Sequence, residues 1–528
     1  MAKIWIKYTK QERYDDCIPH AEIGYWVDEP PVGVEITEAE KEAERIAALK
    51  CALQAILDRT LALKRYTLAV FGPMSQGKST LVGQLIYCAG EIRTKTIDTF
   101  AAEGRTLIGR DTFKYSWVSD QSDVERKSRQ TADCHWLGLS IIGDDYLAIM
   151  DTPGNPEFIG KTIAGITHAD AALLVVSASY GEFESGISQM KEHLNLAAKF
   201  GIKTLIVAVT KMDGIASADQ KFRFDDIVNT ITGSAQKVGF SRVGLLFVPV
   251  GGLDNLNILN ANDQWSWYRG PSLFTALQSV NVSNVRMEQK LPVISEASQL
   301  PGTNGLRCTV LSVTHGAAGT ADVVGRVVIG SLQLGAIVQS ASGSGDMKVT
   351  SISRRMGNGF QDCAAGPLPV ATPGDIVTLT LENVPASLAS GHVLTDMGPN
   401  RARMVSSFVA RLTVKAHDNM TTGYEALLNV HGAEVRCRIG RLLNLLNNRT
   451  LAIVENAPLG LHTNQIGDVE IIPLEPVCLD TYITHSRMGT VSIRYVPPEN
   501  PLPLENEDDE PELMRIVATG QVLSVVPQ

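Results

Sequence analysis

Residues near position 75 have the types and spacing of a phosphate-binding loop. The stretch FGPMSQGKST places Gly72, Gly77, Lys78 and Ser79 in the pattern of a glycine, four variable residues and Gly-Lys-Ser. Two glycines allow a tight turn whose N–H groups point at a phosphate, and a helix beginning near Lys78 adds its positive N-terminal end. The Lys78 ammonium can reach the β- and γ-phosphates of a nucleotide. The Ser79 hydroxyl can bind Mg²⁺.

Two further short motifs follow apolar, strand-like segments. In DTPG, the Asp151 carboxylate can hold magnesium through water, and the Gly154 N–H can bind a γ-phosphate. In TKMD, the Asp213 carboxylate can accept hydrogen bonds from both N1–H and the 2-amino group of guanine, whereas adenine lacks this pair of donors. The aliphatic part of Lys211 can cover the base and ribose. The three motifs together predict a site that selects GTP over ATP.

The segments that must position these motifs alternate between strand-like and helical patterns. The strand-like runs are YTLAVFG, YLAIMDTPG, AALLVVSAS, KTLIVAVTKMD and GLLFVPVGG. Such alternation predicts a mostly parallel sheet flanked by helices, with ligands bound at the carboxyl ends of the strands. We therefore expect an α/β GTP-binding domain over residues 66–285.

After about residue 290 the alternation of strand-like and helical segments gives way to short strand-like stretches separated by Gly, Pro and Asn. This pattern predicts two small β-barrel domains, over residues 290–400 and 401–528. Within the second of them, residues 497–514 are Pro-rich and acidic, which is typical of a solvated insertion.

Residues 1–65 form a predicted N-terminal extension with an amphipathic helix. Thr37 and Glu40 have the spacing of a capping box, and apolar residues from Ile46 to Leu63 recur every three or four positions. Such a helix either packs on the neighbouring domain, which is the favoured interpretation, or docks a partner.

Composition restricts the class of protein. The net charge of −10 argues against strong nonspecific binding of nucleic acid by the whole chain. The 8 cysteines contain no Cys-x-x-Cys pair, so neither a zinc site nor a disulfide framework is indicated. No apolar run approaches the roughly 20 residues that span a bilayer, and the N-terminus does not read as a secretory signal. We expect a cytoplasmic monomer without membrane association.

Longer stretches carry a family resemblance, among them TFKYSWVSD, VERKSRQTAD, DTPGNPEFIGKTIAGITHADAALLVVSAS, TPGDIVTLTLENV and EPVCLDTYITHSRMGTVSIR. With these, the chain resembles the translational GTPases of the group that contains elongation factor 1-alpha, the eukaryotic release-factor GTPase and the ribosome-rescue GTPase. The resemblance covers about residues 66–528. It implies a P-loop GTPase domain followed by two β-barrels, GTP or GDP with Mg²⁺ as ligands, and the ribosome and a tRNA or tRNA-mimicking protein as partners.

The resemblance also implies roles for individual residues. The phosphates would be bound by Gly72, Ser75, Gln76, Gly77, Lys78, Ser79 and Thr80. Magnesium would be held by Ser79, the switch threonine Thr131, and Asp151. Guanine would be bound by Thr210, Lys211, Asp213, Gly251 and Gly252. The catalytic positions would be Thr131, Gly154 and Asn155.

The sequence departs from the family at several of these motifs. Asn155 stands where the family has a histidine that orients the attacking water, and an amide cannot become an imidazolium beside the developing charge. Slow GTP hydrolysis is the expected result. Arg129 and Gln130 replace a glycine and an isoleucine in the first switch, and Thr210 replaces an asparagine. Val328 stands in place of a glutamate that carriers of aminoacyl-tRNA use near the amino-acid end.

Three functions fit these observations. The favoured one is a translation factor whose nucleotide state controls a tRNA or tRNA-mimicking partner at the ribosome. The alternative is a hydrolysis-poor, GTP-bound adaptor that recruits another factor to the ribosome. General delivery of aminoacyl-tRNA, as by an elongation factor, fits least well because of Val328, Asn155 and the altered switch.

Overall fold

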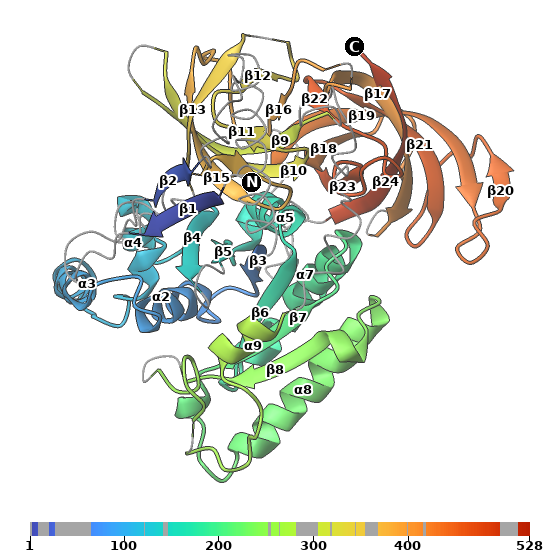
Figure 1. Ribbon diagram of the computed structural model, residues 1–528. Helices are drawn as coiled ribbons and strands as arrows, with labels where there is room; N and C mark the ends of the chain where they lie inside the picture. Colours follow the sequence, from blue (N-terminus) through green and yellow to red (C-terminus); the bar gives the residue numbers. More distant parts are fainter. Residues whose placement is uncertain are drawn as a thin grey trace, which may run out of the picture.

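A six-stranded sheet forms the centre of the domain that carries the motifs (Figure 1). In this computed structural model the strand order is β4-β5-β3-β6-β7-β8, with β4 antiparallel to β5 and all other neighbours parallel. The strands are β3 (Arg65–Phe71), β4 (His135–Ser140), β5 (Tyr146–Asp151), β6 (Ala171–Ser177), β7 (Leu205–Thr210) and β8 (Leu245–Pro249). The predicted α/β class is confirmed.

Helices cover both faces of this sheet because its strands bury apolar side chains on both sides. In β3, Leu68 and Val70 belong to the cluster that contains α2 and α9, whereas Ala69 and Phe71 belong to the cluster that contains α5, α7 and α8. The helices are α2 (Lys78–Cys88), α3 (Thr94–Ile108), α4 (Asp123–Ser128), α5 (Ile159–Thr167), α6 (Glu182–Ser185), α7 (Ile187–Lys199), α8 (Gln220–Lys237) and α9 (Leu273–Ser279). Short 3-10 turns are η1 (Ser116–Val118), η2 (Pro156–Phe158), η3 (Met212–Gly214) and η4 (Arg242–Gly244).

The next domain is a closed barrel with the strand order β10-β15-β13-β12-β16-β9. Its strands are β9 (Arg307–His315), β10 (Ala321–Ile329), β12 (Ile337–Ser340), β13 (Met347–Ser353), β15 (Ile376–Glu382) and β16 (Val393–Thr395). A small sheet of β11 (Leu332–Gln333) and β14 (Val370–Ala371) accompanies it.

The last domain is also built from antiparallel strands, ordered β18-β23-β24-β17-β21-β19-β20. Additional pairing of β18 with β19 makes the pairings run in a ring, from which β20 extends as an edge strand. The strands are β17 (Met404–Val414), β18 (Glu425–Val430), β19 (Ala433–Leu446), β20 (Ile453–Asn456), β21 (Ile466–Pro473), β22 (Val477–Cys478), β23 (Thr490–Tyr495) and β24 (Ile516–Pro527).

One carboxylate joins all three domains. Asp170 precedes β6, and its Oδ2 accepts a hydrogen bond from the backbone N–H of Thr67 at 2.9 Å. Its Oδ1 accepts from Arg326 of the first barrel and from Arg487 of the last domain, each at 2.7 Å. Asp170 and Arg326 are both buried, so this ion pair is shielded from water and salt.

The structure describes residues 3–8, 21–26, 65–120, 122–140, 146–251, 255–262, 264–280, 305–316, 319–343, 345–353, 368–398, 400–415, 419–496 and 516–528. In the N-terminal extension, β1 (Lys3–Tyr8) and β2 (Ala21–Trp26) pair as an antiparallel hairpin that the sequence patterns did not predict. The predicted amphipathic helix and the acidic segment 497–514 lie outside the described residues. None of the described helices is long and apolar enough to cross a membrane.

Candidate functional site: a nucleotide pocket at the strand ends

The glycine-rich loop links the end of β3 to the start of α2 and needs its glycines. Gly72 has φ +152°, and a Cβ there would lie 2.2 Å from the carbonyl oxygen of Val175. Gly77 has φ +89°, and the helix begins at the next residue, Lys78. The loop therefore aims backbone N–H groups and a helix N-terminus at one point, which is the arrangement that binds phosphate.

Lys78 is buried beneath the loop. Its ammonium donates a hydrogen bond to the carbonyl oxygen of Pro73 at 2.8 Å. A Cβ on Gly154 would lie 2.1 Å from the same nitrogen, so Gly154 leaves the room that the ammonium occupies. Burial lowers the pKa of Lys78 to about 8, although the negative charges of Asp151 and Asp120 act in the opposite direction. A phosphate here would supply the negative charge that favours the ammonium.

The predicted magnesium ligands come together. The hydroxyl oxygens of Ser79 and Thr131 lie 2.9 Å apart. Asp151 accepts a hydrogen bond from Ser119 at 2.7 Å through Oδ2, while its buried Oδ1 has no hydrogen-bond partner among the described residues. Hydroxyl and carboxylate oxygens are the ligands that Mg²⁺ prefers. These residues fit a magnesium ion beside the phosphate-binding loop.

A second carboxylate beside this place was not predicted. Asp120 accepts a hydrogen bond from the Thr131 hydroxyl at 2.7 Å. Burial, and then the nearby charge of Asp151, raise the pKa of Asp120 to about 7. A cation bound at Ser79 and Thr131 would stabilise the ionised form of Asp120.

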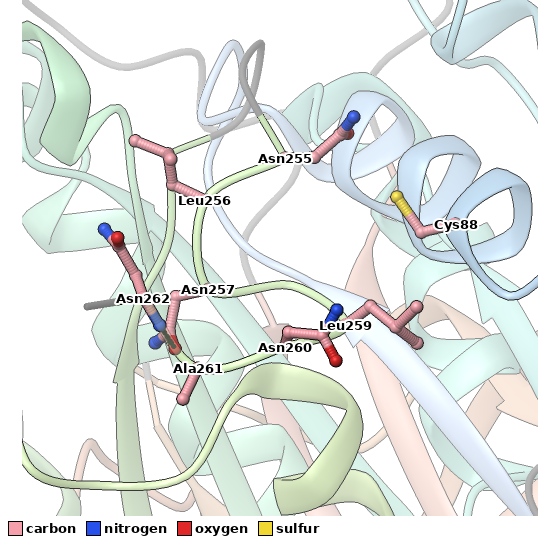
Figure 2. A pocket seen from close by; sticks show the side chains of 8 residues that line it. All are labelled: Cys88, Asn255, Leu256, Asn257, Leu259, Asn260, Ala261 and Asn262. Carbon is pink, nitrogen blue, oxygen red and sulfur yellow. Dashed lines mark hydrogen bonds between the residues drawn. The ribbon is translucent and has the colours of Figure 1, made fainter. Parts of the chain in front are cut away.

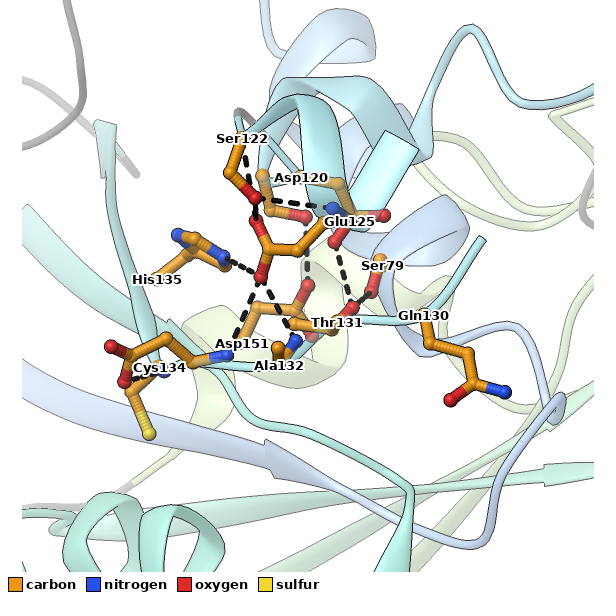
Figure 3. A network of polar contacts seen from close by, with 12 residues as sticks. Ser79, Asp120, Ser122, Glu125, Gln130, Thr131, Ala132, Cys134, His135 and Asp151 are labelled. Atoms are coloured by element: carbon orange, nitrogen blue, oxygen red, sulfur yellow. Dashed lines mark hydrogen bonds and ion pairs between the residues drawn. The ribbon is translucent and has the colours of Figure 1, made fainter. Parts of the chain in front are cut away.

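The switch segment before β4 is organised around the buried carboxylate of Glu125 (Figure 3). Glu125 accepts hydrogen bonds from the Ser122 hydroxyl at 2.9 Å and from the N–H of Ala132 at 2.9 Å, and it pairs with His135 Nε2 at 2.8 Å. Although burial opposes it, the hydrogen bond from His135 and the others lower the pKa of Glu125 to about 2. The capping-box spacing of Ser122 and Glu125 is the sequence signal that could have revealed this arrangement.

Of the residues predicted to bind guanine, Lys211 and Asp213 follow β7 and Gly251 follows β8. Asp213 is exposed in η3, and a Cβ on Gly251 would lie 3.2 Å from its Oδ1, so Gly251 leaves space beside the carboxylate. The ammonium of Lys211 donates to the carbonyl oxygen of Ser75 at 3.1 Å and pairs with Glu182 at 2.6 Å. The guanine motif is thereby tied to the phosphate-binding loop. Gly252 lies outside the described residues.

Two side chains of the predicted site serve as internal supports. The Thr210 hydroxyl donates to the carbonyl oxygen of Gln76 at 2.8 Å, so threonine at this motif position holds the loop directly. Gln76 is buried, accepts from the N–H of Ser177 at 2.5 Å, and donates to the carbonyl oxygen of Glu182 at 3.0 Å. The Gln76 side chain therefore faces the protein, which leaves only its backbone for a phosphate.

Asn155 is held on both sides. Its amide oxygen accepts from the N–H of Glu157 at 3.0 Å, which caps η2, and its amide nitrogen donates to Gln130 at 3.2 Å. The carbonyl oxygen of Gly154 accepts from Gln189 at 2.7 Å. The pair of amides joins the DTPG motif to the first switch.

These parts surround one cavity of about 690 Å³. Of the predicted site residues, those that line it are Ser75, Gly77, Lys78, Ser79, Thr80, Thr131, Gly154, Asn155, Thr210, Lys211 and Asp213. A separate cavity of about 320 Å³ is lined by Cys88 and by residues of the loop 255–262, including Leu256, which pairs with Gly251 (Figure 2). It contains none of the predicted site residues.

Comparisons with known proteins agree with this geometry. The family model described as the elongation factor Tu GTP binding domain matches residues 64–310, and the one described as the GTP-eEF1A C-terminal domain matches residues 407–501. Elongation factor 1-alpha, oocyte form, of Xenopus laevis is 31% identical over 433 residues, which cover 81% of this chain and 91% of that protein. The chain belongs to the translational GTPase family of elongation factor 1-alpha.

Other members and similar structures extend this result. Elongation factor 1-alpha of Absidia glauca is 31% identical, with 80% of this chain and 90% of that protein covered. The GTP-bound GTPase-like domain of S. cerevisiae Ski7 has a TM-score of 0.66 at 17% identity, with 87% of this chain and 97% of that chain covered. Elongation factor SelB of Methanococcus maripaludis, in complex with a GTP analogue, has a TM-score of 0.55 at 17% identity, with 88% and 80% covered. The two structures show a shared fold, and the elongation factor 1-alpha sequences show the family.

Proposed function

We propose that this chain is a GTP-binding translation factor that acts at the ribosome, where its nucleotide state controls a tRNA or a tRNA-mimicking protein. The observation that carries the proposal is the single cavity of about 690 Å³ in which residues of the three nucleotide motifs meet. Two β-rich domains follow, and Asp170 joins both of them to the GTPase domain. A nucleotide-dependent change in the GTPase domain can reach a partner through these contacts. We expect the factor to work as a monomer in the cytoplasm.

The proposed roles follow the geometry of the cavity. The loop from Gly72 to Thr80 binds the phosphates, with Lys78 supplying the positive charge. Ser79, Thr131 and Asp151 hold magnesium, which would neutralise phosphate charge when bound. Asp213 selects guanine, beside the space left by Gly251.

The alternative function is that of a hydrolysis-poor, GTP-bound adaptor, and Asn155 is the observation that favours it. In the structure both ends of the Asn155 amide are already engaged, with Glu157 and Gln130. Less of this group is then available to orient a water molecule than of a histidine with a free ring nitrogen. Hydrolysis by the proposed factor should therefore be slow.

Delivery of aminoacyl-tRNA remains the least favoured function. Val328 is buried in a small apolar cluster with Val393, Ala402, Cys478 and Met488, which come from both β-rich domains. An apolar side chain packed there offers no acceptor to the amino group of an aminoacyl ester.

Single-turnover GTP hydrolysis, measured with and without ribosomes, tests the proposal. Mg²⁺-dependent GTP binding together with ribosome-stimulated hydrolysis would support the translation factor. GTP binding and ribosome binding without stimulated hydrolysis would favour the adaptor instead. Absence of GTP binding would contradict both functions.

A further inference from the structure

We propose that Arg129 is a catalytic residue for GTP hydrolysis, contacting the γ-phosphate from within the first switch of the same chain. This inference rests on the proposed function, because it needs GTP in the cavity described above. Arg129 lines that cavity together with Gln130, Thr131 and Asn155. Its role would be electrostatic, supplying positive charge where negative charge accumulates during phosphoryl transfer.

The position of Arg129 follows from its distance to the magnesium ligands along the chain. Two residues of extended chain span at most about 7 Å, so Arg129 begins close to Thr131. The Thr131 hydroxyl lies 2.9 Å from that of Ser79, at the start of α2. Lys78, which would bind the β- and γ-phosphates, lines the same cavity, so a long side chain anchored here can reach the γ-phosphate.

The turn that carries Arg129 is rigidly supported. Arg129 ends α4 in the left-handed conformation, with φ +60°, and its N–H donates to the carbonyl oxygen of Glu125. The hydroxyl of Ser128 donates to the same carbonyl oxygen at 3.2 Å. On the other side of the turn, the N–H of Ala132 donates to the Glu125 carboxylate at 2.9 Å. These bonds hold the backbone on both sides of Arg129, so its side chain starts from a defined place beside the cavity.

The Arg129 guanidinium is also uncommitted. Within the described ranges, its side chain makes no hydrogen bond or ion pair, and the residue is exposed at the cavity. Arg126 on the same helix differs, since its guanidinium lies 4.8 Å from the ring centroid of Trp117 and donates to the carbonyl oxygen of Asp120 at 3.0 Å. The other two cations of the cavity are occupied as well: Lys78 bonds Pro73, and Lys211 pairs with Glu182.

The reaction that Arg129 would assist is balanced without a further reactant. The oxygen of a water molecule forms a bond to the γ-phosphorus while the bond from that phosphorus to the bridging oxygen breaks. The electron pair of the broken bond stays on the β-phosphate of GDP, and the proton lost by water is taken up by the released phosphate. Arg129 would stabilise the charge on the transferring group.

The test compares Arg129→Ala and Arg129→Lys with the control Lys127→Ala, an exposed residue on the same helix that does not line the cavity. We expect Arg129→Ala to lower ribosome-stimulated hydrolysis by about 100-fold, with GTP affinity within a few-fold of the unsubstituted protein. Lysine should retain part of the rate because it keeps the charge but loses the planar fork. Lys127→Ala should have no effect.

A second measurement separates catalysis from ribosome contact. GDP with aluminium fluoride mimics the transferring phosphoryl group, and its binding can be measured without ribosomes. Arg129→Ala should weaken that binding about 100-fold while leaving GDP binding unchanged. Unchanged aluminium fluoride binding would overturn the proposal, even if the ribosome-dependent rate fell, because the residue would then act on the ribosome. A hydrolysis rate of Arg129→Ala within two-fold of that of the unsubstituted protein would overturn the proposal as well. If the unsubstituted protein does not bind GTP at all, the proposed function itself is contradicted.

Discussion

In the proposed function, guanine selection depends on one exposed carboxylate, Asp213, which follows β7. We expect Asp213→Ala to weaken GTP binding by roughly 30-fold or more, because a charge-assisted bidentate contact contributes about 2 to 4 kcal/mol. Titration with fluorescent GTP measures this, with ATP as competitor. The control is Asp225→Ala, an exposed carboxylate on α8. Tight binding of ATP by the unsubstituted protein would contradict guanine selection.

We propose that Asn155 limits how fast bound GTP is hydrolysed. We expect Asn155→His to raise ribosome-stimulated hydrolysis by about 10-fold or more, equivalent to 1.4 kcal/mol of barrier, with GTP affinity within a few-fold. The physical reason is that an imidazole can both orient the water and become positively charged. The amide of Asn155 cannot become charged, and it is already bonded to Gln130 and Glu157. Single-turnover kinetics give the answer, with Asn155→Ala as the comparison. An unsubstituted rate equal to that of elongation factor 1-alpha in the same assay, with no gain from histidine, would show that another residue orients the water.

The sequence predicted that Lys78, Ser79 and Asp213 come together, because short motifs place them at fixed offsets from strand ends, and in the structure all three line one cavity. It did not predict that the Gln76 side chain turns inward, since nothing in the loop pattern distinguishes a side chain that faces a ligand from one that bonds Ser177. Asp120 was missed because it belongs to no short motif and reaches Thr131 only after the chain folds.

Among the structural elements, the segment from α4 to β4 depends on Glu125. We expect Glu125→Gln to increase the initial rate of tryptic cleavage after Lys127 or Arg129 by about 10-fold. The reason is that loss of a charge-assisted hydrogen bond costs about 1.5 kcal/mol or more, and cleavage follows the population of the opened segment. The control is Asp98→Asn, an exposed carboxylate on α3.

His135 provides a further check on that segment, since it pairs with Glu125 at 2.8 Å. If this pair holds the segment closed, His135→Gln should accelerate tryptic cleavage less in the Glu125→Gln background than in the unsubstituted protein. We expect a coupling free energy between the two substitutions of about 1 kcal/mol. Additive effects of the two substitutions would show that the pair does not hold the segment closed.

The parallel strands were predicted from the sequence because each buried strand is a continuous apolar run that ends in a motif, as in β6 and β7. The strand β4 was not predicted, because its sequence HWLGLS mixes polar and apolar residues and ends in no motif. It lies at the edge of the sheet. The hairpin of β1 and β2 was missed for a similar reason, because its short strands are separated by a polar stretch that masks any period.

At the scale of the whole molecule, we expect two buried histidines to make the stability of the domain contacts depend on pH. His168 Nε2 donates to the carbonyl oxygen of His431 at 3.1 Å, which joins the GTPase domain to the last domain. Burial, and then the charge of Arg326, lower the pKa of His168 to about 3, with further lowering by His431 and Arg487. Burial lowers the pKa of His431 to about 4, although Asp480 acts against it.

The sign of the pH dependence follows from these pKa values. An unfolded histidine has a pKa of about 6.5, so below that pH the unfolded chain binds protons that the folded chain does not, and stability falls. Between pH 6 and pH 5, we expect the free energy of unfolding of His168→Gln to fall by about 1 kcal/mol less than that of the unsubstituted protein. Urea unfolding at the two pH values measures this difference. Comparing the two proteins isolates His168, because Asp120, whose pKa is raised to about 7, contributes equally to both. Equal losses in the two proteins would contradict the assignment.

The order of one α/β domain and two β-rich domains was predicted from the change, after about residue 290, to short strand-like segments, and it is confirmed. The contacts between domains were not, because Asp170 lies 156 residues from Arg326 and 317 from Arg487, and no local pattern connects such positions. Only the folded chain reveals that one carboxylate receives both guanidinium groups.

That shared carboxylate also restricts how the chain can diverge during evolution. A substitution at Asp170 leaves two cations without the carboxylate they share, one of them on the buried Arg326, and this costs about 3 to 5 kcal/mol. A loss of Arg326 or Arg487 alone removes one of the two guanidinium groups that bond Asp170 Oδ1. We therefore expect positions 170, 326 and 487 to change together among descendants of this chain. A substitution at this contact in one β-rich domain then restricts which substitutions the other domain tolerates.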